Sequence, residues 1–390
     1  MRWPGTSALS STRPATTLAA LRACFRSLGS HPDLGVIGLI LAMKLVLVAF
    51  GAAVVQVDLG HQITSLGDVI TVWNRWDAPH YLYLAEHGCQ AAGEHRWFLA
   101  FFPLFPWLIR SFAPWFGFLG AALLIATISS LALAVVLRRL AELDGEGLGE
   151  PTVWFLFIFP TAYFLHVGYT ESLFLLLSVG AFLAARHRAW WVVGLLAFLA
   201  SLTRMNGLVL VPALGLEAWQ EYRRERRFDA RWLWIGTALL GIGVYVALNQ
   251  VVGGDPLRFL DLQREHWYRR FAWPRSGVAH CLDSLHWRGP ADSVMVSLME
   301  PVFVVVGLVA TIAAWFRLRV SYAVWMTGNW LMSCSQTFVF GVPRFTMLLF
   351  PMFILMAQAT RQRLAALATF ASLLFLAFFC TQFAQGHWAF

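Results

Sequence analysis

The sequence is poor in charged residues. Asp, Glu, Lys and Arg make up 13% of its 390 residues, hydrophobic residues make up 59%, and the mean hydropathy is +0.64. A soluble domain has about 25% charged and about 45–50% apolar residues. The composition therefore excludes an ordinary soluble enzyme, a disordered chain and a nucleic-acid-binding module. We assign the net charge of +8 to basic loops that face the cytoplasm and not to a nucleic acid partner.

Cysteine motifs and lysine are also scarce. The five cysteines are scattered without a C-x-x-C spacing, which excludes a cysteine zinc knuckle and a disulfide scaffold. A bridge between Cys89 and Cys281 stays open, because the sequence does not show whether their Cα atoms approach each other. Lys44 is the only lysine beside 28 arginines, which is typical of a GC-rich, bacterial genome.

Long apolar runs dominate the rest of the chain. We predict an all-α polytopic membrane protein, with a polar cytoplasmic arm over residues 1–34 and a single transmembrane domain over 35–390 that has no internal repeat. Several runs are shorter than the roughly 20 residues of a full span, which is tolerated where protein or a water-filled cavity surrounds the backbone. The eleven predicted spans are 35–57, 117–137, 151–167, 171–186, 189–203, 206–219, 231–252, 294–316, 320–341, 344–359 and 364–384.

The segment 97–112 decides how the loops are sorted. It is apolar, but it contains two prolines and has Arg110 near its end. If it does not cross the membrane, the arginine-rich loops all fall on the side of the N-terminus, which the positive-inside rule makes cytoplasmic. We therefore predict an interfacial or re-entrant helix here. Two long loops, 58–116 and 253–293, then face outward.

The first outer loop contains the strongest candidate for chemistry. Asp77 lies at or near the start of a predicted helix, and His80 and Tyr81 follow on the same helix face. A carboxylate at this place, flanked by Trp76 and beside Arg75, can act as a general base. The alternative is a capping aspartate within an interfacial tryptophan belt. Spacing alone leaves both alternatives open.

Three further polar features lie at the outer ends of predicted spans. Tyr169 and Glu171 precede one span, Arg204 and Asn206 interrupt an apolar stretch, and Arg344 follows a tight turn. Because arginine matches phosphate oxygens with a bidentate fork, both arginines are candidate anion-binding residues. Each feature also has a structural alternative: helix capping for Glu171, a turn with a snorkelling side chain for Arg204, and a hairpin for Arg344.

The closing segment 386–390 (GHWAF) is the fifth feature and is typical of an aromatic interface anchor. All five features fall on the outer side, although only the basic loops set the topology. A base, a second carboxylate and two arginines on one face favour a site where a phosphate-bearing lipid donor meets an acceptor.

Several short stretches also match a known family in their order and spacing. They are 75–81 (RWDAPHY), 101–110 (FFPLFPWLIR), 169–174 (YTESLF), 203–207 (TRMNG), 343–345 (PRF) and 388–390 (WAF). On these stretches the chain resembles the PIG-V-like proteins of the GPI mannosyltransferase 2 family, in particular their prokaryotic homologues. The resemblance implies a GT-C-like fold, a polyprenyl-phosphate-mannose donor and an inverting transfer. It also implies Asp77 as the catalytic base and, carried over with it, Arg204 and Arg344 on the donor phosphate.

We therefore predict a membrane mannosyltransferase that acts on a hydroxyl of a lipid-linked or other extracytoplasmic acceptor. The residues expected to orient the substrates or Asp77 are Arg75, Trp76, His80, Tyr81, Tyr169, Glu171 and Asn206. No cofactor and no metal is needed, because arginine can balance the leaving charge; a metal at Asp77 and Glu171 stays open.

The expected location is a bacterial plasma membrane, with membrane lipids around the helices and the active site at the outer face. In a eukaryote this would be the lumenal face of the ER membrane. Two rival functions remain. One is a lipid or glycolipid transporter or flippase, which also has broken helices and intramembrane charges. The other is a non-catalytic membrane assembly subunit in which Asp77 only caps a helix.

Overall fold

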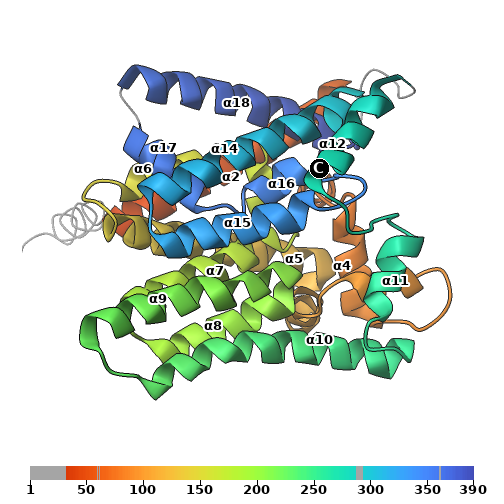
Figure 1. Ribbon diagram of the computed structural model, residues 1–390. Helices are drawn as coiled ribbons and strands as arrows, with labels where there is room; N and C mark the ends of the chain where they lie inside the picture. The colour runs from red at the N-terminus through yellow and green to blue at the C-terminus, as the bar shows by residue number, and fades with distance from the viewer. Residues whose placement is uncertain (1–31, 59, 61, 287–292, 360–361) are drawn as a thin grey trace, which may run out of the picture.

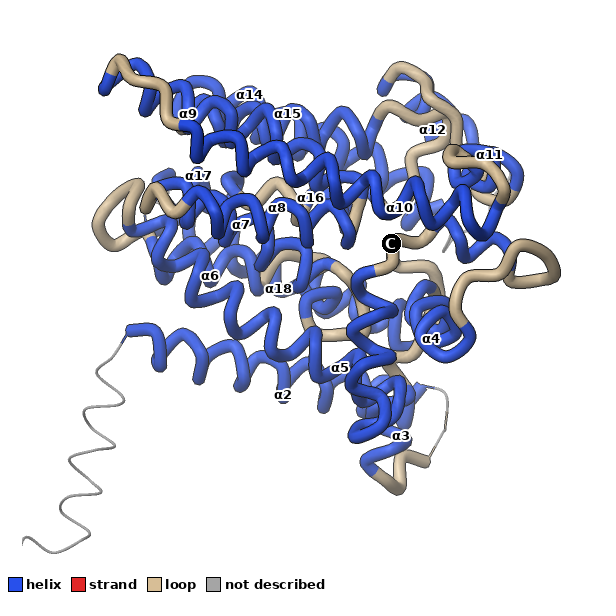
Figure 2. The backbone as a smooth tube through the Cα atoms, turned by 90° about the horizontal axis from the view of Figure 1, so that it is seen from below, coloured by secondary structure: helices blue, strands red, loops and turns tan. Residues whose placement is uncertain are grey.

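The computed structural model describes residues 32–58, 60, 62–286, 293–359 and 362–390. Within these residues every regular element is a helix, and the only β-type pairing is an isolated bridge between Phe271 and Gln336. Most of the long helices run alongside one another as a bundle, which Figures 1 and 2 show from two directions. The prediction of an all-α protein is confirmed.

The helices follow each other with short connections. The α-helices are α2 (Pro32–Asp58), α3 (Leu66–Thr71), α4 (Asp77–His87), α5 (Leu104–Glu142), α6 (Gly149–Phe157), α7 (Glu171–Arg186), α8 (Trp190–Thr203), α9 (Leu210–Glu225), α10 (Thr237–Gly253), α11 (Arg258–Glu265), α12 (Pro274–Asp283), α14 (Glu300–Arg317), α15 (Val320–Cys334), α16 (Val342–Thr346), α17 (Pro351–Ala359) and α18 (Gln362–Gln385). Shorter 3₁₀ or π segments are η1 (Arg96–Ala100), η2 (Ala162–Leu165), η3 (Met205–Val209), η4 (Ala230–Gly236), η5 (Ser284–His286) and η6 (Ser293–Met299).

Five helical segments in the described part of the chain are long and apolar enough to cross a membrane by length and composition. They are Pro32–Asp58, Leu104–Glu142, Ala230–Gly253, Ser293–Arg317 and Arg363–Gln385. All eleven predicted spans overlap helices, but two extend beyond the end of their helix and a third is interrupted. The helix ends at Phe157 within 151–167 and at Cys334 within 320–341, whereas 344–359 contains a break between Thr346, the end of α16, and Pro351, the start of α17. The number of spans stays a prediction, and so does the GT-C-like arrangement.

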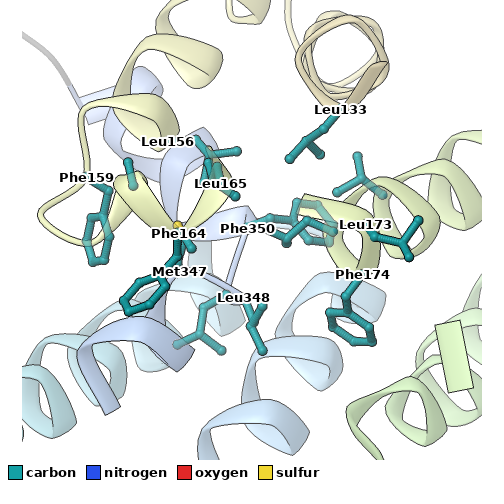
Figure 3. Close-up of a cluster of buried hydrophobic side chains, with 14 of the residues drawn as sticks. Leu133, Leu156, Phe159, Phe164, Leu165, Leu173, Phe174, Met347, Leu348 and Phe350 are labelled. Carbon is teal, nitrogen blue, oxygen red and sulfur yellow. The ribbon is translucent and has the colours of Figure 1, made fainter. Parts of the chain in front are cut away.

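Two of these interruptions pack against each other in the core. Figure 3 shows Phe164 and Leu165 of η2 in one cluster with Met347, Leu348 and Phe350, which connect α16 to α17. All five side chains are at most 1% exposed. Irregular backbone is tolerated at membrane depth where protein buries it. These two segments lead directly to the polar residues of the candidate site.

The segment 97–112 is split between η1 and the first part of α5. Gly117 interrupts α5 with a φ of 68°, so residues 104–116 form a helical piece apart from the long piece that follows. Arg110 Nη2 donates to the carbonyl oxygen of Glu86, at the end of α4, over 2.9 Å. The predicted span 117–137 thus begins at a real break, and the interfacial position of 104–116 stays a prediction.

The arginine-rich loops meet at one end of the bundle, which we call the basic end. Its ion pairs connect elements that are far apart in the sequence. The contacts are Arg138 and Arg139 with Asp33, Arg186 with Asp144, Arg188 with Glu221 and Glu225, and Arg319 with Glu217. In Figure 1 the α9–α10 and α14–α15 connections lie at the left, whereas α4, α11 and α12 lie at the right. The arginine-rich loops were predicted to lie on one side of the membrane, and this arrangement agrees with that. The assignment of the basic end to the cytoplasmic side stays a prediction.

Candidate active site

The site is built around the first residue of α4. Asp77 is the first residue of this helix, within one residue of the predicted start, and the N-cap position belongs to Trp76, which makes no side-chain capping bond. The Asp77 carboxylate accepts a hydrogen bond from Arg344, so its contact in the structure is with a side chain and not with the helix start. The preceding residue, Trp76, has a φ of 55°, which is rare for a bulky side chain.

Arg344 joins Asp77 to a second carboxylate. Its Nη1 donates to Asp77 Oδ2 over 2.8 Å, and its Nε donates to Glu171 Oε1 in a very close contact. The guanidinium lies 4.9 Å from the ring centroid of Tyr169 and 5.1 Å from that of Phe164. Arg344 is only 6% exposed, so the two carboxylates compensate a buried charge that would otherwise be costly. The alternative interpretation of Arg344, as a residue of a tight hairpin only, does not account for these contacts.

Arg204 completes the cluster from the end of α8. Its Nη1 donates to Glu171 Oε1 over 2.5 Å and to Thr170 Oγ1 over 3.0 Å. The side chain is therefore turned to a carboxylate and does not snorkel outward. Glu171 is fully buried and makes no capping bond, and its second oxygen, Oε2, has no hydrogen-bond partner among the described residues. An unsatisfied buried acceptor costs about 1–3 kcal/mol, so this oxygen is a candidate for ligand contact.

Tyr169 holds the turn that presents Asp77. Its hydroxyl donates to the carbonyl oxygen of Arg75 over 2.8 Å and accepts from the backbone N–H of Asp77 over 3.1 Å. Tyr169 immediately precedes the Thr170–Glu171 step that starts α7. The same short segment therefore positions both carboxylates of the site.

Glu300 holds the turn that presents Arg344, and sequence reasoning missed it. Its two oxygens accept from the backbone N–H groups of Gly341 and Val342 over 2.6 and 2.7 Å. Gly341 has a φ of 82°, a conformation that favours glycine. Thr161 Oγ1 also donates to the carbonyl oxygen of Pro343 over 3.1 Å. The signal in the sequence was a carboxylate within the apolar run 294–316, where ionisable residues generally mark functional sites.

The charges around Asp77 keep its carboxyl group ionised. Burial raises the pKa of Asp77, but Arg344, with smaller contributions from His80 and Arg269, brings it below the ordinary value. Arg269 lies in the outer loop 253–293 and was also missed by sequence reasoning. The group is thus a carboxylate at neutral pH, the form that a general base needs.

The other two residues of the α4 face are uncharged at neutral pH. Burial lowers the pKa of His80, although Asp77 opposes this, and its Nδ1 is buried without a hydrogen-bond partner among the described residues. The His80 ring lies 4.4 Å from that of Phe98. Burial raises the pKa of Tyr81 to about 12, so its hydroxyl stays a proton donor. Both side chains can therefore donate or accept hydrogen bonds beside Asp77.

Three expected orienting residues have other partners. Asn206 Nδ2 donates to Asn329 on α15 over 2.8 Å, and Arg75 Nη2 donates to the carbonyl oxygen of Ala384 over 3.0 Å. Trp76 is 40% exposed and meets the ring of Trp388 edge to face, with 5.2 Å between centroids. Of these three, only Trp76 combines exposure with a position next to Asp77.

The expectation of an interface anchor at residues 386–390 is wrong for the last two residues. Ala389 and Phe390 are 1% and 3% exposed, and the Tyr163 hydroxyl donates to the Ala389 carbonyl. The Trp388 ring stacks on that of Phe340 at 3.8 Å. This segment therefore closes one wall of the site.

Cys89 is a free thiol, so it forms no bridge to Cys281.

Metal ligation has no obvious place in this arrangement. No group of three or more His, Cys, Asp or Glu side chains in the described ranges is arranged to hold a metal ion. Asp77 and Glu171, the pair for which a metal was left open, both accept hydrogen bonds from Arg344.

Comparison with known proteins shows that part of the chain is similar to one family. Residues 63–225 match the sequence model of the family described as Mannosyltransferase (PIG-V). GPI alpha-1,6-mannosyltransferase 2 of Cricetulus griseus is 37% identical over 154 residues, and that of Rattus norvegicus 36% over 154 residues. The enzyme of Homo sapiens is 36% identical over 155 residues.

Each of these matches covers 36% of this chain and only 30% of the relative. The matched segment contains Asp77, Tyr169, Glu171, Arg204 and Asn206, whereas Arg344 lies outside it. The resemblance predicted from the short motifs is therefore confirmed over residues 63–225, which match the sequence model of the PIG-V mannosyltransferase family.

Proposed function

We propose that this protein is a membrane glycosyltransferase that moves a mannosyl unit from polyprenyl-phosphate-mannose to an acceptor hydroxyl. The observation that carries the proposal is the Asp77–Arg344–Glu171–Arg204 cluster, because it combines an ionised carboxylate with buried arginines at one end of the bundle. The family match supports the mannosyl group. The donor lipid, the acceptor and the role of Asp77 are parts of the proposal.

In the proposed mechanism Asp77 is the general base. Its carboxylate is 31% exposed, whereas Arg344 beside it is 8% exposed, so the base is the more accessible of the two groups. Asp77 accepts the proton of the acceptor hydroxyl, and the resulting oxygen attacks C1 of the sugar. The bond between C1 and the phosphate oxygen breaks on the opposite face, which inverts the anomeric centre and releases polyprenyl phosphate.

The arginines have two roles in this scheme. Arg344 keeps Asp77 ionised and aimed, and together with Arg204 it offsets the charge that builds on the leaving phosphate. Tyr169 and Glu171 fix these groups through the contacts described above. His80 and Tyr81 lie on the same face of α4 and would bind sugar hydroxyls or the acceptor.

The site is proposed to open to the outer face of the membrane. This orientation is supported by the position of the site, which lies away from the basic end. Loops rich in arginine are retained on the cytoplasmic side, so the site would lie on the opposite side. A single cysteine introduced at Glu94 should react with a membrane-impermeant maleimide in intact cells, whereas one at Glu225 should not. The reverse pattern would contradict this orientation.

The transporter and the assembly subunit are less well supported. A transporter would need ionisable groups near the middle of the membrane and related halves of the chain, but the cluster gathers at one end. In an assembly subunit Asp77 would only cap α4, but the N-cap residue is Trp76, and the Asp77 carboxylate accepts a hydrogen bond from Arg344.

Transfer can be tested directly with purified protein in lipid nanodiscs. We expect label from polyprenyl-phosphate-[¹⁴C]mannose to appear in a glycolipid or glycoside product when a membrane lipid extract or alkyl glycosides are added as acceptors. Polyprenyl phosphate should be released in equal amount, and the anomeric configuration should be inverted. In vesicles, movement of the intact donor between leaflets without transfer would instead identify a flippase, and neither activity would favour an assembly subunit.

A further inference from the structure

The charges of the core cluster cancel each other. Arg344 pairs with Asp77 and Glu171, and Arg204 pairs with Glu171. Two guanidinium groups thus face two carboxylates, and both arginines are almost fully enclosed, with side chains 8% and 11% exposed. A phosphate that arrives beside this cluster meets no net positive charge. A further cation at this place would favour binding of an anion.

Arg269 is a cation in the right place. It lies between α11 and α12 in the outer loop, and it is partly exposed. Its Nη2 donates to the carbonyl oxygen of Phe340 over 3.3 Å, which is a long hydrogen bond. Among the residues that the structure describes, Arg269 forms no ion pair with a carboxylate. Its remaining N–H groups are therefore available to an anion.

The contact with Phe340 fixes Arg269 against the wall of the site. Phe340 precedes Gly341, where Glu300 holds the turn that leads to Arg344. The ring of Phe340 stacks on Trp388, which in turn meets Trp76 beside Asp77. Arg269 therefore approaches Asp77 and Arg344 from the loop side.

The carboxylates near Arg269 do not fully compensate its positive charge. Burial lowers the pKa of the guanidinium, and Arg344 and Arg204 add to this, although Asp77 and Glu300 oppose it. Glu300 uses both of its oxygens on backbone N–H groups. Arg75 is a weaker candidate for the missing cation, because its side chain is turned to the end of α18.

We propose that Arg269 binds the phosphate group of the polyprenyl-linked donor, and of the polyprenyl phosphate product, from the outer loop. Arg204 and Arg344 then hold the two carboxylates and face the same phosphate from the other side. This inference rests on the proposed function for the identity of the lipid. It assigns a binding role to a residue outside the segment that matches the family.

The test measures binding of polyprenyl phosphate and does not require transfer. Purified full-length protein in nanodiscs is titrated with undecaprenyl phosphate, with undecaprenol and with inorganic phosphate. We expect the phosphorylated lipid to bind more tightly than either of the others. Arg269→Gln should weaken that binding about 10- to 100-fold, as expected for loss of a hydrogen bond between charged groups, and should leave undecaprenol binding unchanged. Arg269→Lys should recover part of the affinity, since it keeps the charge without the planar fork.

Arg270→Gln is the matched control. It removes the same charge one residue away, from an exposed side chain, and should bind undecaprenyl phosphate as the unmodified protein does. Equal binding by Arg269→Gln and the unmodified protein, equal losses in both variants, or an equal loss for undecaprenol would each overturn the proposal. The proposal would also be overturned if inorganic phosphate bound as tightly as undecaprenyl phosphate and its binding depended on Arg269. If Arg269-dependent lipid binding is found but no mannose is ever transferred, the inference holds and the proposed function fails.

Discussion

Buried carboxylates occur at both ends of the bundle, and they are partnered differently. At the basic end each carboxylate has both oxygens bonded. Asp33 binds Arg138 and Arg139, Asp144 binds Arg186 and Tyr322, and Glu217 binds Arg319, with Ser321 in close contact. These groups connect α2, α5, α7, α9 and α15 and leave no acceptor unused.

At the site end the pairing is incomplete. Glu171 Oε2 is buried without a partner, and Asp77 keeps 31% of its side chain exposed. Further buried polar atoms without a partner among the described residues lie along the segment before and after Asp77: Trp73 Nε1, Asn74 Oδ1, Arg75 Nε and His80 Nδ1. Because unmet buried polar groups are costly, these atoms beside Asp77 are candidates for contact with a ligand; buried atoms without a partner in the described part of the chain also occur away from the site, such as Trp190 Nε1 and Ser178 Oγ. The same type of ion pair is thus fully satisfied at one end and incompletely satisfied at the other.

The largest effect among the partners of Asp77 is expected for Arg344. Arg344→Gln removes the cation shared by Asp77 and Glu171, and we expect kcat/KM for donor to fall about 10²–10³-fold, as for the loss of one charge-stabilising donor. The acid limb of the pH profile should also move to higher pH. The base works only when deprotonated, and loss of Arg344 raises the pKa of Asp77 toward its ordinary value.

The matched variant at the basic end is Arg319→Gln. It also deprives a buried glutamate of its arginine, but it should leave the transfer rate per folded molecule and the pH profile unchanged. Equal losses of transfer in the two variants would remove the distinction between the two ends.

A second pair compares the glutamates themselves. Glu171→Gln and Glu217→Gln each break a buried ion pair, which costs up to about 3–5 kcal/mol of stability. We expect thermal unfolding to shift downward in both. Transfer per folded molecule should fall about tenfold only in Glu171→Gln, as expected for roughly 1.4 kcal/mol of lost alignment between Arg344, Arg204 and Asp77. Normal transfer in Glu171→Gln would reduce this residue to a structural role.

The smallest effect is expected for Tyr169→Phe. This change keeps the ring beneath Arg344 but removes the hydroxyl that bonds the Arg75 carbonyl and the Asp77 N–H. A typical hydrogen bond contributes about 0.5–1.5 kcal/mol, so we expect a two- to tenfold loss of transfer. Tyr322→Phe removes a hydroxyl of the basic end that bonds Asp144 over 2.8 Å, and its transfer rate should stay unchanged. A similar loss in both would show that the effect is not local to the site.

The sequence predicted those features of the two ends that depend on composition and local pattern. Apolar runs located the helices, the arginine-rich loops located one end, and Asp77 was placed within one residue of the start of α4. Chain order and spacing of the motifs identified Glu171, Arg204 and Arg344 as members of one site. Each of these inferences needs only neighbouring residues or a known pattern.

The pairing itself could not be predicted, because it joins residues that are far apart in the chain. Arg344 lies 267 positions from Asp77, and tertiary packing alone decides which of its possible partners it meets. The same reason explains the bond of Asn206 to Asn329 and the burial of Phe390. Glu300 is different: its carboxylate within an apolar run was visible, but its targets, the N–H groups of Gly341 and Val342, were not.

The most direct test of the account is the transfer rate of Asp77→Asn. Asparagine keeps the size of the side chain and its hydrogen bond to Arg344 but cannot take a proton, so transfer per folded molecule should fall by about 10²–10⁴-fold. Asp33→Asn, which changes a paired carboxylate of the basic end, should retain the full rate per folded molecule. If Asp77→Asn retains more than about a tenth of the activity, a loss below the range of a general base, Asp77 is not the base and the central claim is contradicted.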